Sequence, residues 1–347
     1  MNHNQEELAR ITGILLEPGD NDGKLPKAMD DLNRLFWSIS GLEMERYEYR
    51  ENVYLSHGKA IGPVWAAMCI KDNLRTKKFI RGIQQGIQHA LEKFPSRPVH
   101  ILYAGTGPFA ALAVPLTTVF ESEEIRFTFL EINPLSINLL KKMVAAFEIG
   151  PYLYDIKQGD ASNYQVDEDK PIHIIITETM QNALQKEPQA AITLNLVPQM
   201  LAGGILIPQN ILVEAALLDP EKDMERMTGS NRPDHECYFP LGKIFELNMD
   251  FPSRYLTTGG SGNSCAFPDV EIVVPKGIPE GFKHFSLFTT IQVFKGELLK
   301  PWQCSLTLPK RIRELDRDKN APDKISFQYV MNEKPGFEFK IDSNIKG

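Results

Sequence analysis

Short apolar runs alternate with segments of helical periodicity between residues 96 and 208. Strands are predicted from Val99 to the turn Gly105-Thr106-Gly107, and at 126–131, 155–160, 172–177 and 203–208. Helices are predicted from Phe109 onward, from Leu135 to Phe147, and over 190–201. Apolar strands separated by helices predict a doubly wound, Rossmann-like parallel sheet covered on both faces.

After residue 208 the apolar residues occur at every second position. Segments 285–293, 325–331 and 337–341 alternate in this way, and residues rich in Gly and Pro separate them. This pattern predicts an antiparallel sheet or β-barrel with one exposed face. The polar, turn-rich stretch 219–240 predicts an excursion from it.

Before residue 96 the pattern is mainly helical. Apolar residues between Val64 and Leu91 recur at spacings of three and four, which predicts one long amphipathic helix or a broken pair. Segment 45–54 interleaves aromatic and charged residues. It predicts either a half-buried helix or a flap over a site, and His57 beyond it is interpreted as a loop histidine.

Composition limits the partners and the compartment. The net charge is −7 and no long Lys/Arg cluster occurs, which argues against nucleic acid. Four widely spaced cysteines without a C-x-x-C pair suggest neither a metal site nor a disulfide framework. The N-terminus lacks a signal-peptide pattern, and no apolar run is long enough to span a bilayer. We therefore expect a cytoplasmic protein without a membrane partner.

The glycine turn and two acids predict a nucleotide crevice. Gly105 and Gly107 permit a sharp bend and close approach of a ligand, although such a turn is often only structural. Glu131 ends the second strand, 24 positions after Gly107, where a carboxylate can accept both ribose hydroxyls. Asp160 either reaches an adenine amino group or caps a turn. The spacing between Gly107 and Glu131 is typical of sites that bind NAD and of sites that bind S-adenosylmethionine.

Two further acids follow the fourth strand. Glu178 ends the strand and Glu187 lies nine residues later, so the loop between them can bring both carboxylates to one point. Two adjacent carboxylates require a cation between them, and a planar guanidinium suits such a pair. The alternative for Glu187 is a favourable interaction with a helix N-terminus. This pair is expected two strands away from the glycine turn across the sheet.

These motifs resemble the protein arginine methyltransferase family, a group of class I S-adenosylmethionine-dependent methyltransferases. Stretch 178–187 is similar to the family's double-Glu loop, and 72–79 to the helix before its first strand. The turn 105–109 and stretch 130–134 most resemble the symmetric-dimethylating branch, and 203–208 is similar to the sheet-to-barrel junction. The resemblance implies an N-terminal helical region (1–95), a cofactor-binding Rossmann-like domain (96–208) and an antiparallel β-barrel (209–347).

The resemblance also implies roles for residues. Arg75 would pair with the cofactor's carboxylate above Gly105 and Gly107, and Glu178 and Glu187 would grip an arginine guanidinium. Tyr103 stands where the family more often has an acid, and Met180 would line the site or pack in the core. The set expected at the cofactor comprises Arg75, Tyr103, Gly105, Gly107, Glu131 and Asp160, and the set expected at the acceptor comprises Tyr54, Glu178, Met180 and Glu187.

One departure from the family bears on the substrate. No Thr-His-Trp stretch occurs in the predicted barrel, and the nearest segments, 288–291 and 301–304, do not reproduce it. Because that loop helps form the channel of protein-modifying members, its absence favours free arginine or another small guanidino compound, as for a bacterial-type small-molecule member. The alternatives are a methyltransferase for another small molecule (N, O or C acceptor) or a catalytically silent scaffold. The excursion at 219–240 corresponds to the family's dimerisation segment and implies a homodimer.

Overall fold

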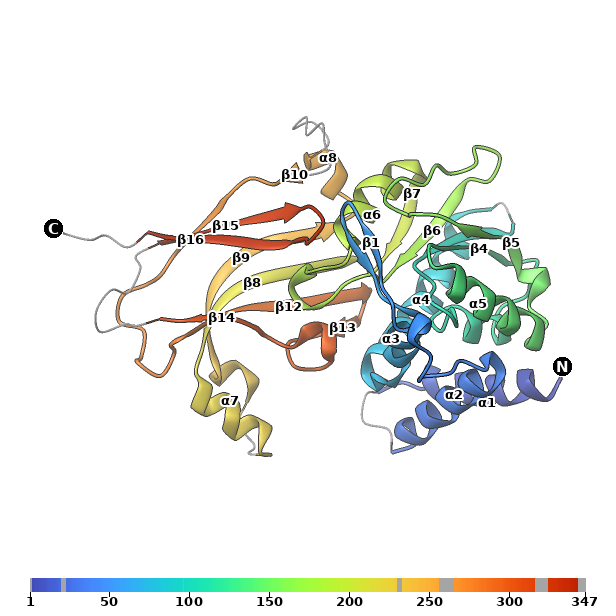
Figure 1. The fold of residues 1–347 in the computed structure, drawn as a ribbon, viewed down its shortest axis with the longest axis horizontal. Helices are drawn as coiled ribbons and strands as arrows, with labels where there is room; N and C mark the ends of the chain where they lie inside the picture. Colours follow the sequence, from blue (N-terminus) through green and yellow to red (C-terminus); the bar gives the residue numbers. More distant parts are fainter. Residues whose placement is uncertain are drawn as a thin grey trace.

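The computed structural model describes residues 2–19, 23–95, 97–229, 233–255, 265–315 and 324–342. Helices and a parallel sheet form one half of the molecule, and antiparallel sheets form the other (Figure 1). This arrangement confirms the predicted fold class, a Rossmann-like sheet with an N-terminal helical region and an antiparallel C-terminal β part. Within the described ranges, no helix combines the length and the apolar character needed to cross a membrane.

The parallel sheet has the strand order β5-β4-β3-β6-β7. Its strands are β3 (Val99–Ala104), β4 (Ile125–Glu131), β5 (Leu153–Gln158), β6 (Ile172–Thr177) and β7 (Met200–Ile207). The strand order reverses between β3 and β6, and ligands of such sheets bind at the carboxyl edge of this point. Because β3 pairs directly with β6, the glycine turn and the loop after β6 are neighbours. The expected separation of two strands is wrong.

Helices cover both faces of this sheet. One apolar cluster joins it to α1 (His3–Leu16), α2 (Leu25–Ser40), α4 (Asn73–Lys93) and α5 (Pro134–Ala146). A second cluster joins the opposite face to α6 (Gln189–Leu196). The periodic segment 64–91 is the predicted broken pair, because α3 (Pro63–Met68) and a 3-10 turn precede α4.

The helix predicted from Phe109 is wrong. The chain makes turns after Gly107 and then a 3-10 helix at Val114–Thr118. Ala110 has a φ of +43°, a left-handed conformation that a right-handed helix cannot include.

Segment 45–54 is not a half-buried helix either. It contains a 3-10 turn at Tyr47–Tyr49 and enters a hairpin of β1 (Val53–Leu55) and β2 (Gly58–Ala60). The Lys59 backbone N–H donates to the Lys186 carbonyl at 2.9 Å. The hairpin therefore lies on the loop that follows β6, as the flap alternative required.

Two antiparallel sheets form the C-terminal part. One contains β8 (Asn210–Leu218), β9 (Tyr238–Asn248), β12 (His284–Phe294), β13 (Glu297–Leu299) and β14 (Lys310–Glu314). The other contains β10 (Cys265–Ala266), β11 (Val270–Val273), β15 (Lys324–Met331) and β16 (Gly336–Asp342). The three alternating segments coincide with β12, β15 and β16. Their buried faces meet in aromatic contacts such as Phe285 on Phe327, with ring centroids 5.4 Å apart.

Short helices interrupt these sheets at two places. Between β8 and β9, within the predicted excursion, α7 (Pro220–Met227) projects from the sheet and a 3-10 turn follows at Asp234–Glu236 (Figure 1). Residues 230–232 of the excursion lie outside the described part. Helix α8 (Phe251–Tyr255) follows β9.

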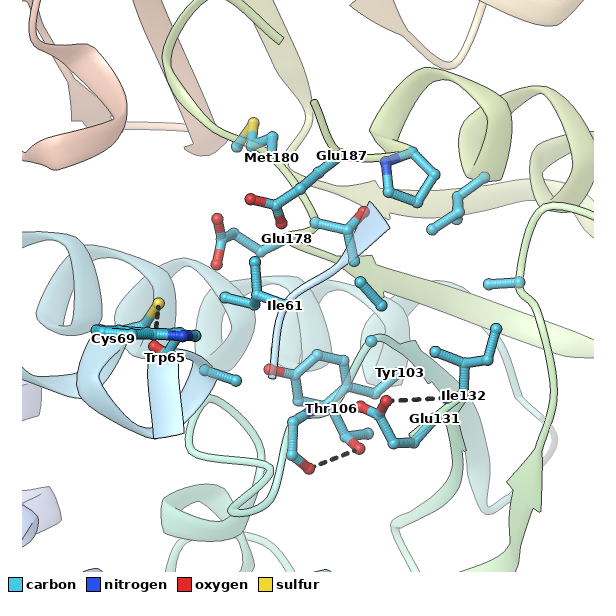
Figure 2. Close-up of a pocket in the computed structure, with 18 of the residues that line it drawn as sticks. Ile61, Trp65, Cys69, Tyr103, Thr106, Glu131, Ile132, Glu178, Met180 and Glu187 are labelled. Carbon is cyan, nitrogen blue, oxygen red and sulfur yellow. Dashed lines mark hydrogen bonds between the residues drawn. The ribbon is translucent and has the colours of Figure 1, made fainter. Parts of the chain in front are cut away.

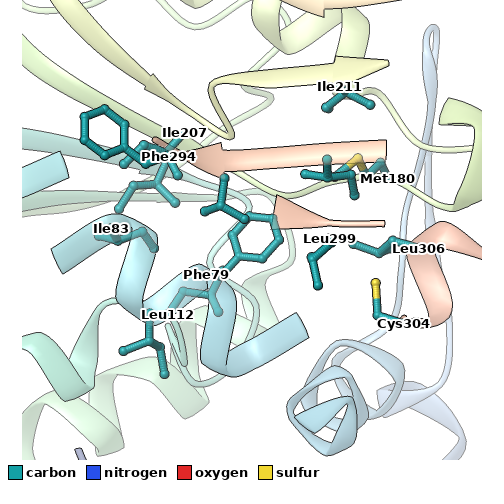
Figure 3. Packing of buried hydrophobic residues seen from close by; sticks show 14 of the residues in the cluster. Phe79, Ile83, Leu112, Met180, Ile207, Ile211, Phe294, Leu299, Cys304 and Leu306 are labelled. Carbon is teal, nitrogen blue, oxygen red and sulfur yellow. The ribbon is translucent and has the colours of Figure 1, made fainter. Parts of the chain in front are cut away.

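Helix α4 joins the two halves of the molecule. Its residues Phe79 and Ile83 pack in the same cluster as Phe294 and Leu299 of the antiparallel part (Figure 3). Beside them, Lys78 Nζ and Arg81 Nη2 lie 3.2 and 2.7 Å from the carboxylate of the buried Glu297. The parallel sheet and the β part therefore share one core.

Candidate active site

A cavity of about 470 Å³ opens at the carboxyl edge of the parallel sheet. Figure 2 shows Tyr103, Thr106 and Glu131 at one end and Glu178, Met180 and Glu187 at the other. Nine of the ten residues predicted for the site line this cavity. The exception is Tyr54, which is 77% exposed and does not line the cavity.

The glycine turn is pressed against the loop after β6. Gly105 and Gly107 have φ values of +77° and +59°, which favour glycine. A Cβ on Gly105 would overlap Cγ2 of Thr179. The missing Cβ of Gly105 therefore allows the turn to pack closely against Thr179, and the turn also lines the cavity.

Glu131 is held by backbone donors. The Gly107 N–H donates to Oε2 at 2.7 Å, and the N–H groups of Ile132 and Asn133 each donate to Oε1 at 2.9 Å. Burial raises the pKa of this carboxyl, and the three donors oppose that rise. Since each carboxylate oxygen has two lone-pair sites, Oε2 can accept one further bond from a ligand.

Asp160 caps a turn at the edge of the cavity. Its Oδ1 accepts from the backbone N–H and the hydroxyl of Ser162, at 2.8 and 2.7 Å. The capping alternative therefore describes a real contact. It does not conflict with ligand binding, because Asp160 also lines the cavity.

Arg75 and Glu178 form a buried ion pair, with side chains 7% and 6% exposed. Nη1 of Arg75 also donates to the Cys69 carbonyl at 2.9 Å, whereas its buried Nε has no hydrogen-bond partner. The sequence predicted separate ligands for these two residues and gave no sign that they pair. The pair fixes Glu178 and leaves the Nε–H of Arg75 unused.

Glu187 is almost fully buried at the same end of the cavity. Burial raises the pKa of its carboxyl, opposed by a hydrogen bond from Gln181 and by the charges of Arg75 and Lys59. No basic side chain in the described part of the chain forms an ion pair with it. A buried carboxylate in this state favours a cationic ligand.

Gln189 holds the beginning of the loop. Its Oε1 accepts from the Thr179 N–H at 2.9 Å and the Thr179 hydroxyl at 3.0 Å, and its Nε2 donates to the Thr177 carbonyl at 3.2 Å. Gln189 is 1% exposed. Because these bonds flank Glu178, they fix the backbone from which that carboxylate projects.

The antiparallel part holds the rest of the loop. Ala183, Leu184 and Lys186 have positive φ values of 54°, 51° and 67°, which is unfavourable for residues other than glycine. The Ala183 N–H donates to the hydroxyl of Thr289 at 3.0 Å, and the hydroxyl of Tyr329 donates to the Leu184 carbonyl at 2.9 Å. The loop conformation thus depends on contacts with β12 and β15.

Several cavity residues were missed by sequence reasoning. Lys59 comes from the hairpin, Ile61 from the link that follows it and Trp65 from α3, and Ser305 and Leu306 come from the β part. The Ser305 N–H donates to Asp72 Oδ2 at 2.8 Å, directly after the segment 301–304, which does not reproduce the family's Thr-His-Trp stretch. These residues belong to no pattern, so only the fold could reveal them.

Across the described ranges, no group of three or more His, Cys, Asp or Glu side chains is placed to hold a metal ion.

Comparisons with known proteins give likenesses to solved structures. No protein-family model matches the chain, and no curated protein matches it. Among solved structures, the chain is similar to a Trypanosoma brucei PRMT1 enzyme-prozyme heterotetrameric complex with AdoHcy. The sequence identity is 13% and the TM-score 0.49, over 80% of this chain and 92% of that one. We draw no conclusion about function from a likeness at this level.

Proposed function

We propose that this chain is an S-adenosylmethionine-dependent N-methyltransferase whose acceptor is a guanidino nitrogen of arginine or of another small guanidino compound. One observation carries the proposal. Two buried carboxylates, those of Glu178 and Glu187, line one end of a cavity whose other end is formed by a glycine turn and Glu131.

The residues at the glycine end suit the cofactor. When bound, S-adenosylmethionine supplies an electrophilic methyl group on a sulfonium. The unpartnered Nε of Arg75 would donate to the cofactor's carboxylate, and Oε2 of Glu131 would accept from a ribose hydroxyl. Asp160 would contact the adenine amino group, and the glycine turn would leave room for the methionine part of the cofactor.

The residues at the other end suit a guanidinium. Bound between Glu178 and Glu187, it would neutralise a carboxylate that has no ion pair. The two carboxylates would draw positive charge toward the nitrogens they bind and leave the third nitrogen richer in electrons. Holding that nitrogen in line for transfer can supply about 7–11 kcal/mol. Glu187, whose pKa is raised by burial, can accept the proton lost after transfer.

Methyl transfer tests the proposal directly. The protein is incubated with methyl-labelled S-adenosylmethionine and either free arginine or an arginine-rich peptide, and methylarginine is measured by mass spectrometry. Glu178→Gln and Glu187→Gln should abolish transfer while S-adenosylhomocysteine still binds in calorimetry. Exposed Glu168→Gln is the matched control. Cofactor binding without methyl transfer to any guanidine would refute the proposal. A methylated product formed from another small molecule would instead identify the alternative acceptor.

We further propose that the chain forms a homodimer through the excursion at 219–240. Helix α7 projects from the β part and exposes Met224 and Met227, at 67% and 72%. Large exposed apolar side chains on a projecting helix favour association. Sedimentation velocity tests this: Met224→Lys with Met227→Lys should yield monomers, and a wild-type monomer at micromolar concentration would contradict it.

A further inference from the structure

Lys59 brings a positive charge into the acceptor end of the cavity. It lies on β2 and lines the cavity together with Glu178 and Glu187. Its backbone N–H donates to the carbonyl of Lys186, the residue before Glu187, and its charge lowers the pKa of the Glu187 carboxyl. In Figure 2, Ile61, two residues further along the chain, lies beside Glu178. The hairpin therefore places Lys59 near Glu187, in the wall of the same cavity.

The charges of the cavity do not balance around a simple guanidinium. Arg75 already neutralises Glu178, whereas the Lys59 ammonium forms no ion pair with any described residue. A guanidinium bound at Glu187 would therefore share the cavity with an unneutralised ammonium, and like charges in a partly desolvated space repel. An acceptor that also carries an anionic group removes this repulsion.

The surroundings of the loop disfavour a cationic peptide. Lys186 is exposed next to Glu187, and burial together with the charge of Lys186 lowers the pKa of Lys310. Positive charges therefore lie beside the part of the loop next to Glu187: Lys186 itself, Lys59 on β2 and Lys310 on β14. An arginine-rich peptide adds positive charge there and offers no carboxylate at the position of Lys59.

We propose that Lys59 binds the α-carboxylate of the acceptor, so that the substrate class is a free amino acid with a guanidino side chain. The inference rests on the proposed guanidino methyl transfer and specifies its substrate. Arginine fits the requirement. Its decarboxylated analogue agmatine retains the guanidine and lacks the group that Lys59 would bind.

Binding calorimetry in the presence of S-adenosylhomocysteine tests the inference with a readout independent of turnover. The wild type should bind arginine at least about 10-fold more tightly than agmatine, because a hydrogen bond to a charged group contributes this much. In Lys59→Gln, the ratio of the two affinities should fall by about 10- to 100-fold. Lys186→Gln removes a nearby exposed charge outside the cavity and should keep the wild-type ratio.

Three results would overturn the inference. One is an unchanged ratio in Lys59→Gln. Another is a ratio that falls equally in Lys186→Gln, which would indicate only a long-range charge effect. The third is a loss of S-adenosylhomocysteine affinity in Lys59→Gln at a constant arginine-to-agmatine ratio, which would assign Lys59 to the cofactor. If the wild type methylates agmatine or a peptide as efficiently as arginine, the inference about Lys59 fails but the proposed function stands. If it methylates no guanidine, the proposed function fails with it.

Discussion

The contact between the glycine turn and Thr179 can be tested by a double-mutant cycle. Gly105→Ala adds a methyl group that overlaps Cγ2 of Thr179. The threonine cannot rotate away freely, because its hydroxyl is bonded to Gln189 at 3.0 Å. The substitution also places a Cβ on a residue with a φ of +77°. Two separate penalties therefore act at one position.

Their sizes can be estimated separately. A left-handed φ costs a residue with a side chain roughly 1–2 kcal/mol. Forcing an extra methyl group into a packed site costs about 1–3 kcal/mol. Thr179→Ser removes Cγ2 but keeps the hydroxyl, so only the first penalty should remain in that background. Gly105→Ala should therefore lower the unfolding free energy by about 2–5 kcal/mol alone and about 1–2 kcal/mol with Thr179→Ser.

Urea unfolding followed by circular dichroism measures all four proteins of the cycle. Gly41→Ala is the matched control, because Gly41 has a φ of +64° and the nearest atom to its added Cβ is Lys142 Nζ at 3.7 Å. It should show only the conformational penalty. Equal losses for Gly105→Ala in both backgrounds, or a loss no larger than that of Gly41→Ala, would refute the steric argument.

Three further predictions concern the loop that carries the glutamates. Gln189→Leu removes three hydrogen bonds around Glu178 and should lower the free energy of unfolding by about 2–5 kcal/mol. It should also lower kcat more than Gln189→Glu, which keeps a hydrogen-bond acceptor for Thr179. Equal kcat values for the two variants would contradict the positioning role of Gln189. Tyr329→Phe leaves the Leu184 carbonyl without its donor and should lower the free energy of unfolding by about 1–3 kcal/mol. It should raise KM for the guanidine while the affinity for S-adenosylhomocysteine stays constant. A selective loss of S-adenosylhomocysteine affinity would contradict this prediction. Burial raises the pKa of Glu187, and the ionised carboxylate is the form that binds the guanidinium. As the pH decreases, kcat/KM at saturating cofactor should therefore begin to fall at a pH above the ordinary glutamate pKa of about 4.3. A fall that begins only at or below that pH would contradict the assignment.

The three central strands of the parallel sheet, β4, β3 and β6, were predictable because they satisfy one local rule. A strand buried on both faces has a continuous apolar sequence, and segment 172–177 coincides with β6 residue for residue. The alternating segment of β15 follows a second local rule, since one of its faces is more deeply buried than the other. The alternation is a weaker guide to burial in β12, which is buried on both faces over residues 285–289, and in β16, where residues 336–341 are only half-buried or exposed. Sequence alone could not give the strand order, because nothing local distinguishes the neighbours of β3.

The failures have a common physical origin in contacts between distant residues. Arg75 and Glu178 are 103 positions apart, so no pattern announces their ion pair. The hairpin replaced the predicted helix because its backbone bonds to Lys186, far along the chain. In the same way, the left-handed Ala110 ended a helix that the apolar sequence after Phe109 favoured.

The loop 178–187 indicates what the antiparallel part contributes to the site. Its three left-handed residues cost on the order of 1–3 kcal/mol each, and such strain persists only where surrounding structure imposes it. The contacts that impose it come from Thr289 and Tyr329, and both belong to the β part. The glycine turn and Glu131, by contrast, are held within the parallel sheet. The middle of the loop is therefore supported by the β part, whereas Glu178 at its beginning is held by Arg75 and Gln189, so changes in the β part should act on Glu187 before they reach the glycine turn.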